Sequence, residues 1–171
     1  FARDAADHPV ELLLVEPDST HPDRWRALVR PGRRARVGAS LSVGDGERLT
    51  ITGAGEHGER IVAADAPIAE ILARHGRLPL PPYVARHARP ERLDHERYQT
   101  VYARVAGSVA APTAGLHFSD AVLARLGLRG VEVHALTLHV GPATFRPIRT
   151  SRVEAHRLPP ERVALSPSVS A

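Results

Sequence analysis

Short runs of alternating apolar and polar residues, separated by turn residues, fill the first third of the chain. The run "VELLLV" (10–15) is β-compatible, and "WRALVR" (25–30) follows it after a turn-rich stretch. Leu41 and Val43 would share one face of a later strand. Glycines typical of turns stand between the runs, at positions 44, 46, 53, 55 and 58. We therefore expect residues 1–64 to form a small antiparallel β-barrel-like domain.

From residue 65 onward the spacing becomes helical. The segment "DAPIAEILARHG" predicts a helix with Asp65 as its N-cap, a stop at Gly76, and one apolar face made by Ile68, Ile71 and Leu72. An extended loop with prolines at 79, 81, 82 and 90 should follow. A second helix is expected from about Asp94 through "LDHERYQTVYARV", with its apolar side formed by Tyr98, Val101 and Tyr102.

The remaining pattern predicts one more helix and a strand. Ser119 is the expected N-cap of a helix over "DAVLARLG", with a core-facing side made by Val122, Leu123 and Leu126. "GVEVHALTLHVG" is expected to be a strand that places Thr137 and His139 on one face near its C-terminal end, where open α/β sheets bind ligands. The expected fold class is therefore α+β or α/β, with the barrel-like domain (1–64) followed by part of an α/β layered domain (65–171).

Composition narrows the chemistry. The sequence has no cysteine, which excludes disulfides, thiol nucleophiles and cysteine-bound zinc. All 23 basic residues are arginine, which excludes lysine chemistry and favours contacts to phosphate or carboxylate groups. The net charge of +4 agrees with a polyanionic partner but is modest. No membrane-length apolar run or secretion signal occurs, so we expect a cytoplasmic protein. A chain without methionine that begins at Phe1 is expected to be a fragment or a trimmed product.

Three short stretches could carry a site, and each has a purely structural alternative. In "APTAGLHFSD", small residues before a helix and His117 suit an anion or polar ligand, or else form a close-packed corner. His139, with Thr137, could reach a pocket or be satisfied by a backbone carbonyl. "ERYQT" could hold substrate or be a solvated helix face. No histidine pair has metal-binding spacing, and no P-loop or dinucleotide fingerprint occurs.

Taken together, "RYQTVYA", "VAAPTAGLHF" and "TLHVGPATFRPI" resemble the S-adenosylmethionine:tRNA ribosyltransferase-isomerase family of the queuosine pathway. They occur in that family's order and spacing, and "PLPPY" precedes them as it does there. "WRALVRPGRRARVG" matches the family's upstream β-rich part. The resemblance thus covers nearly the whole chain.

This resemblance implies an enzyme that transfers the ribosyl moiety of S-adenosylmethionine to the aminomethyl group of a 7-deazaguanine base at the tRNA wobble position. Rearrangement gives epoxyqueuosine, with release of adenine and methionine. Such chemistry needs a base, an acid and a dry pocket. The implied partners are the tRNA anticodon loop and S-adenosylmethionine, which serves as co-substrate. The resemblance implies no tightly bound cofactor, no metal ion and no association with a membrane. We expect a monomer.

Matching motif positions assign residue roles as hypotheses. His117 and His139 would transfer or position protons, and the residues expected to hold or line the substrate are Arg97, Tyr98, Gln99, Thr113, Gly115, Thr137 and Thr144. The arginines of "RPGRRAR" would meet tRNA phosphates or form a solvated basic loop.

The sequence also departs from the family. Segments that the family carries before Phe1 and after Ala171 are absent, which implies an internal fragment lacking both family termini, and loss of activity in this fragment is an open alternative. In "HRLPPE", His156 and Glu161 are kept, but Leu158 and Pro159 replace the family's methionine and second histidine. Two alternatives therefore remain open. One is a non-catalytic RNA-binding fragment, and the other is a paralogue that acts on a free deazapurine or another small acceptor.

Overall fold

The computed structural model describes residues 1–21, 23–44, 46–55, 58–81, 84, 92–145, 148 and 150–170. The chain divides into two compact units, Phe1–Arg77 and Leu78–Ala171. Pro79 and Pro81 belong to no helix or strand, which fits the loop predicted there. Other residues of that predicted loop lie outside the described residues, among them Pro82, Tyr83 and Pro90.

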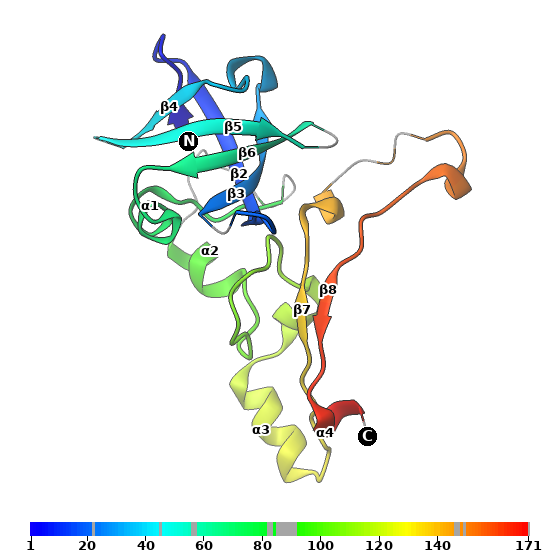
Figure 1. Cartoon of the computed structure of the whole chain (residues 1–171). Helices are drawn as coiled ribbons and strands as arrows, with labels where there is room; N and C mark the ends of the chain where they lie inside the picture. Colours follow the sequence, from blue (N-terminus) through cyan, green and yellow to red (C-terminus); the bar gives the residue numbers. More distant parts are fainter. Residues whose placement is uncertain are drawn as a thin grey trace. The chain divides into compact units, whose positions relative to one another are not determined.

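The first unit contains a closed antiparallel barrel. Its strands are β1 (Ala2–Arg3), β2 (Pro9–Pro17), β3 (Arg24–Arg30), β4 (Ser40–Val43), β5 (Glu47–Ala54) and β6 (Glu59–Ala64). Their order around the barrel is β1-β2-β3-β6-β5-β4, and every neighbouring pair is antiparallel (Figure 1). In β4, Leu41 and Val43 are buried while Ser40 and Ser42 are exposed, as the alternating pattern requires. The predicted small antiparallel barrel is confirmed.

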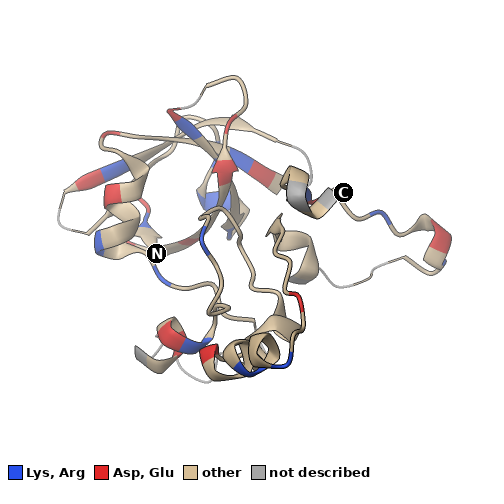
Figure 2. Cartoon of the chain, turned by 90° about the horizontal axis from the view of Figure 1, so that it is seen from below, with Lys and Arg blue, Asp and Glu red and all other residues tan. Residues whose placement is uncertain are grey.

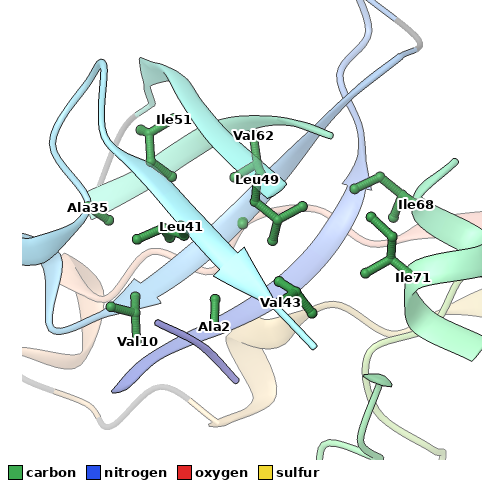
Figure 3. Packing of buried hydrophobic residues seen from close by; sticks show 11 residues of the cluster. Ala2, Val10, Ala35, Leu41, Val43, Leu49, Ile51, Val62, Ile68 and Ile71 are labelled. Carbon is green, nitrogen blue, oxygen red and sulfur yellow. The ribbon is translucent and has the colours of Figure 1, made fainter. Parts of the chain in front are cut away.

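The hydrophobic core of this unit fills the barrel. Val10, Leu41, Ile51 and Val62 are completely buried and come from four different strands (Figure 3). Burying side chains of this size contributes about 1.5–3 kcal/mol each, so the interior is the main source of the unit's stability.

Helix α1 (Ile68–His75) extends the same core. Ile68 and Ile71 are buried in the cluster, and the helix ends at Gly76 as expected. The sequence analysis placed the domain change after residue 64, whereas the compact unit continues to Arg77 because this helix packs on the barrel.

Two details predicted for α1 are wrong. Asp65 does not cap the helix, since Pro67 is the N-cap and the Asp65 carboxylate accepts the backbone N–H of Arg48 at 3.0 Å. Leu72 is 41% exposed and lies outside the buried face. Both differences arise from the barrel, which takes up the Asp65 carboxylate and accepts only the two isoleucines of the helix.

An arginine and two glutamates form a hydrogen-bonded cluster in the barrel wall. Arg26 donates through Nε and Nη2 to Glu59 Oε2, at 3.2 and 2.6 Å, and through Nη1 to Glu16 Oε1 at 2.8 Å. Glu59 is only 8% exposed, so its carboxylate requires this partner. The three residues tie β2, β3 and β6 together and occupy Arg26, which is therefore not available to an external anion.

The second unit mixes short helices with one small antiparallel sheet. Its elements are α2 (Arg92–Arg97), η3 (Thr113–His117), α3 (Asp120–Leu128), β7 (Thr137–His139), η4 (Pro142–Phe145), η5 (Val153–Ala155), β8 (Arg162–Ala164) and α4 (Pro167–Ser170). Strand β7 pairs with β8, with His139 opposite Arg162 (Figure 1). This mixture confirms the expected fold class of a barrel followed by a partial α/β part. None of the described helices is long and apolar enough to cross a bilayer.

The second predicted helix and the predicted strand are both shorter than expected. Helix α2 stops at Arg97, where the Gln99 side chain accepts the backbone N–H of Thr100 at 2.8 Å and so competes with a helical hydrogen bond. Tyr98 is buried, but Val101 and Tyr102 are exposed. Regular strand structure is confined to 137–139, because β8 offers only three partner residues.

Helix α3 agrees with the sequence prediction at its start. Ser119 is the N-cap and its hydroxyl accepts the Val122 N–H at 3.4 Å. The predicted core-facing side is only partly correct, since Val122 is exposed while Leu123 and Leu126 are half-buried.

Candidate functional site

The backbone around His139 is held by a neighbouring serine. Ser108 Oγ donates to the Leu138 carbonyl at 3.1 Å and accepts the Val140 N–H at 3.1 Å. One hydroxyl thus bonds to the peptide groups on both sides of His139. The backbone N–H groups of Val109 and Ala110 also donate to the Val140 carbonyl, at 2.9 and 3.4 Å. Because of these bonds, residues 108–110 run alongside the end of β7.

The imidazole of His139 lies against Gly107. A Cβ atom at Gly107 would stand 2.7 Å from His139 Nδ1 and 2.8 Å from its Cε1, closer than real Cβ contacts. Gly107 also has a φ of +136°, a conformation that side chains other than glycine rarely adopt. The site therefore requires glycine at this position, both for its backbone and for the space that the ring occupies.

One nitrogen of that ring has no partner. His139 Nδ1 is buried and, within the part of the chain that the structure describes, is the one buried side-chain nitrogen or oxygen without a hydrogen bond. Buried polar atoms are almost always paired, so an unpaired one requires an explanation, and a functional role is one such explanation.

A second close approach links η3 to the residues that follow α2. Gly115 is buried, and a Cβ atom there would stand 2.7 Å from Thr100 Cγ2 and would overlap the Tyr102 hydroxyl. The absence of a side chain lets the turn of η3 approach this segment. The structure thus brings the "RYQT" region and the "APTAGLHF" region into contact, as expected if both serve one site.

Many buried positions of the second unit occur in or near these segments. Its buried residues include Tyr98, Thr100, Val109, Ala110, Ala111, Gly115 and Ala143. Most of these side chains are small, so backbone segments that are distant in sequence approach closely there. Two predicted site residues, Tyr98 and Gly115, belong to this buried group.

The other predicted site residues have more open positions. His117 is the last residue of η3 and is exposed, and its side chain has no hydrogen bond to any described residue. Thr137 and His139 are half-buried in β7. Four others are exposed: Arg97, Gln99, Thr113 and Thr144. No hydrogen bond within the described ranges joins His117 to His139. The two histidines therefore have separate surroundings in the structure.

A carboxylate lies at the turn after β7. Glu161 Oε1 accepts the Gly141 N–H at 3.3 Å, and Glu161 immediately precedes β8. This residue is one of the two that "HRLPPE" shares with the resembled family. The hydrogen bond to its carboxylate holds the turn that follows His139 and Val140. Among the described residues, no group of three or more His, Asp or Glu side chains could hold a metal ion.

The sequence analysis missed three residues at this site: Tyr102, Gly107 and Ser108. The sequence analysis placed Tyr102 on the apolar side of a helix and assigned no role to Gly107 or Ser108. The feature of the sequence that could have indicated these residues is the pair Gly107-Ser108, a glycine and a hydroxyl-bearing residue just before an apolar segment. Its role depends on which strand residue lies opposite, and that register is not visible in the sequence.

Comparisons with known proteins agree with these motifs. A family model described as queuosine biosynthesis protein matches residues 1–171. An S-adenosylmethionine:tRNA ribosyltransferase-isomerase of Anaeromyxobacter sp. (strain Fw109-5) is 45% identical over 95% of this chain and 47% of its own length. The protein of the same name from Symbiobacterium thermophilum is 42% identical over 99% of this chain and 49% of its own. The chain thus spans about half the length of the curated relatives it matches.

Among solved structures, one similar chain is the S-adenosylmethionine tRNA ribosyltransferase of Thermotoga maritima. It is 23% identical, with a TM-score of 0.36, and the match covers 81% of this chain and 36% of that one.

Proposed function

Because the chain belongs to the family of queuosine biosynthesis proteins, we propose that it carries part of an S-adenosylmethionine:tRNA ribosyltransferase-isomerase, the activity named for its relatives. In the proposed reaction, the ribosyl moiety of S-adenosylmethionine is transferred to the aminomethyl group of a 7-deazaguanine at the tRNA wobble position. The transferred group then rearranges to give epoxyqueuosine, and adenine and methionine are released. The proposal includes a cytoplasmic, monomeric enzyme.

The observation that carries the proposal is the environment of His139. Its ring rests on Gly107, its flanking peptide groups bond to Ser108, and its Nδ1 is buried without a partner. A histidine needed only for packing would satisfy that nitrogen with a nearby carbonyl. A ring fixed in place without side-chain hydrogen bonds of its own suits a residue that meets a substrate.

His117 is the candidate for the acid or base chemistry that the reaction needs. A base must take a proton beside the sulfonium, and an acid must assist the departure of adenine. His117, exposed and without a partner among the described residues, is open to proton exchange. Arg97, Tyr98 and Gln99 would hold the substrate near the η3 turn, and Thr113, Gly115, Thr137 and Thr144 would line the site.

The partner of the barrel in this proposal is the tRNA backbone. Basic and acidic residues are interspersed over the chain (Figure 2). Arg30, Arg33 and Arg36, however, are exposed and form no ion pair with any described residue. Guanidinium groups in this state can bind phosphates without first breaking an internal pair. We include this loop as a contact for tRNA near the anticodon.

Release of adenine tests the proposed reaction. The full-length protein is incubated with S-adenosylmethionine and with tRNA that carries the aminomethyl-deazaguanine, and adenine is quantified by chromatography. Release that depends on this tRNA is expected. Release with the free base alone would instead indicate a paralogue with a small acceptor. Tight tRNA binding without turnover would indicate a non-catalytic RNA-binding protein.

The residue assignment has its own test. His117→Ala and His139→Ala in the full-length protein should each reduce adenine release by about 10²-fold or more, the usual effect of losing an acid-base group or an oriented hydrogen-bond donor. Circular dichroism should show an unchanged fold. His134→Ala is the matched control, because His134 is an exposed histidine near β7 whose one ion-pair partner among the described residues is the exposed Glu132. Near-normal turnover in both variants would remove these histidines from the site.

A further inference from the structure

We propose that His139 acts as a neutral imidazole that donates a hydrogen bond to the substrate through Nε2–H, and that Gly107 and Ser108 are its positioning residues. This inference rests on the proposed function and deepens it. It assigns His139 a binding and orienting role, where the sequence left proton transfer and positioning as alternatives.

The tautomer follows from the burial of Nδ1. In a neutral imidazole, one ring nitrogen carries the proton and the other has a lone pair. His139 Nδ1 is buried with no partner, so a proton there would be an N–H donor with no acceptor. An unpaired buried N–H is rarer in proteins than an acceptor with a free lone pair. The proton therefore belongs on Nε2, which is not among the buried unpartnered atoms and is the nitrogen that can face a ligand.

The same geometry argues against His139 as the group that carries protons during turnover. A general base or acid alternates between the neutral ring and an imidazolium, which has an N–H on both nitrogens. Each cycle would place a donor on Nδ1, against Gly107, where no described residue accepts a hydrogen bond from it. The ring is instead suited to one fixed state. The atom it meets must be a hydrogen-bond acceptor of the co-substrate, such as a ring nitrogen of the purine or an oxygen of the ribosyl group.

Gly107 and Ser108 determine where that donor points. Gly107 gives the ring its place, since a Cβ atom would stand 2.7 Å from Nδ1. Ser108 holds the peptide groups before and after His139 through its two bonds of 3.1 Å. The ring has no hydrogen bond to a described residue that would fix its orientation, so these contacts with its backbone and with the Nδ1–Cε1 side of the ring supply the constraint. Residues that hold a reacting group in position can affect turnover strongly without touching the substrate.

The first experiment measures the tautomer directly. Nitrogen-15 spectra of the histidine rings in the full-length protein, with His139→Gln used to assign the signal, distinguish a protonated from an unprotonated Nδ1. We expect an unprotonated Nδ1 and a protonated Nε2 at pH 7.5. A protonated Nδ1 would overturn the proposal. The measurement needs no substrate, so it stands even if tRNA-dependent adenine release is absent and the proposed function fails.

The second experiment compares two amides at position 139. The Gln side-chain amide can place an N–H near the position of Nε2, whereas Asn places it near Nδ1. If donation through Nε2 is the role, His139→Gln should keep adenine release within about tenfold of the wild type, while His139→Asn loses on the order of 10²–10³-fold. Equal, near-complete loss in both, with both variants folded, would show that His139 transfers protons and would overturn the assignment.

The third experiment tests the positioning role of Ser108. Ser108→Ala should lower kcat on the order of 10²-fold with little change in the KM for S-adenosylmethionine. Ser108→Thr, which keeps the hydroxyl, should restore most of the rate. The His139 nitrogen-15 signals should broaden or shift in the alanine variant. Unchanged kcat and unchanged ring signals in Ser108→Ala would show that Ser108 does not position His139.

Discussion

At the scale of single residues, two glycines of the second unit leave space that neighbouring side chains occupy. Gly107 makes room for the His139 imidazole, and Gly115 makes room for Thr100 and Tyr102. In both cases the missing side chain brings together segments that are separate in the sequence. Each glycine is therefore sensitive to the smallest substitution.

Replacing Gly115 by alanine should destabilise this chain by about 1–3 kcal/mol, because the added methyl group must displace Thr100 and the Tyr102 hydroxyl. Urea unfolding monitored by circular dichroism measures the change. Tyr102→Phe removes the oxygen that the new methyl group would overlap, so adding it to Gly115→Ala should recover part of the loss.

Gly127→Ala is the matched control for this prediction. Gly127 lies in α3, and no atom stands within 4 Å of the position that its Cβ would take. Alanine there should stabilise the helix by about 0.5–1 kcal/mol. If both alanine variants changed stability equally, the close approach at Gly115 would carry no energetic weight.

A second residue-scale prediction concerns Glu47 in the barrel. Its own backbone N–H, the His75 side chain and the Arg74 guanidinium hold the pKa of the Glu47 carboxyl below its ordinary value. A carboxyl group with a lowered pKa stabilises the folded state above its unfolded pKa, about 4.3, and this contribution disappears as the pH falls through the folded pKa. The free-energy difference between wild type and Glu47→Gln should therefore be larger at pH 7 than at pH 3.

Urea titrations of both proteins at the two pH values provide the measurement. Glu70→Gln is the control, because Glu70 is exposed in α1 and forms no ion pair with a described residue. A Glu47→Gln difference that is independent of pH would contradict the proposed electrostatic contribution.

At the scale of elements, the segment that leads from β3 to β4 has a backbone held by a hydrogen bond and arginine side chains that form no ion pair with described residues. Ala35 is completely buried, and its carbonyl accepts Arg60 Nε at 2.6 Å. The exposed side chains of Arg30, Arg33 and Arg36 project from this anchored loop without ion pairs to described residues. An ordered loop loses little entropy when it binds, which favours a phosphate contact.

The predicted effect of removing two of these charges is a weaker and less salt-dependent interaction with tRNA. Arg33→Ala combined with Arg36→Ala should reduce the slope of log Kobs against log salt by about 1.5, since each lost phosphate contact contributes about 0.7–0.9. Fluorescence anisotropy at several salt concentrations measures it. Arg125→Ala with Arg129→Ala removes the same charge from the α3 end and should leave the slope unchanged. Equal effects of the two pairs would mean that only net charge matters.

At the scale of the whole molecule, the two units differ in how they are stabilised. Every residue of the main hydrophobic cluster, from Ala2 to Ile71, belongs to the first unit. That unit is also a closed barrel without a free sheet edge. In the second unit, by contrast, Val131, Val133 and Leu136 are exposed.

Residues 1–77 should therefore fold alone and unfold cooperatively on heating. Ile71→Ala should destabilise this isolated unit by about 2–5 kcal/mol because it removes a buried side chain, whereas Leu72→Ala, at an exposed position, should cost much less. Thermal denaturation followed by circular dichroism compares the three proteins. A non-cooperative melt of residues 1–77 would mean that the barrel needs the rest of the chain.

The extent of sequence-based prediction differed between the two units for a physical reason. Alternation in β4 and the helical spacing of Ile68 and Ile71 identified the barrel strands and α1, because local periodicity reflects which side faces a core. The predicted continuation of α2 past Arg97 failed, since the Gln99 side chain accepts the Thr100 N–H that a longer helix would use. The strand predicted over residues 130–141 pairs with β8 only at 137–139, so most of its length lacks a strand partner among the described residues.

The sequence by itself determined the barrel, the Ser119 cap, the three motifs and the family, because these depend on periodicity, capping chemistry and residue identity in order. The tertiary structure alone decided that Ser108 bonds on both sides of His139 and that Gly107 receives its ring. It also left Nδ1 without a partner, the fact on which the role of His139 depends. Such contacts join residues about thirty positions apart, and which residues meet there depends on the folded path of the backbone, which no local pattern encodes.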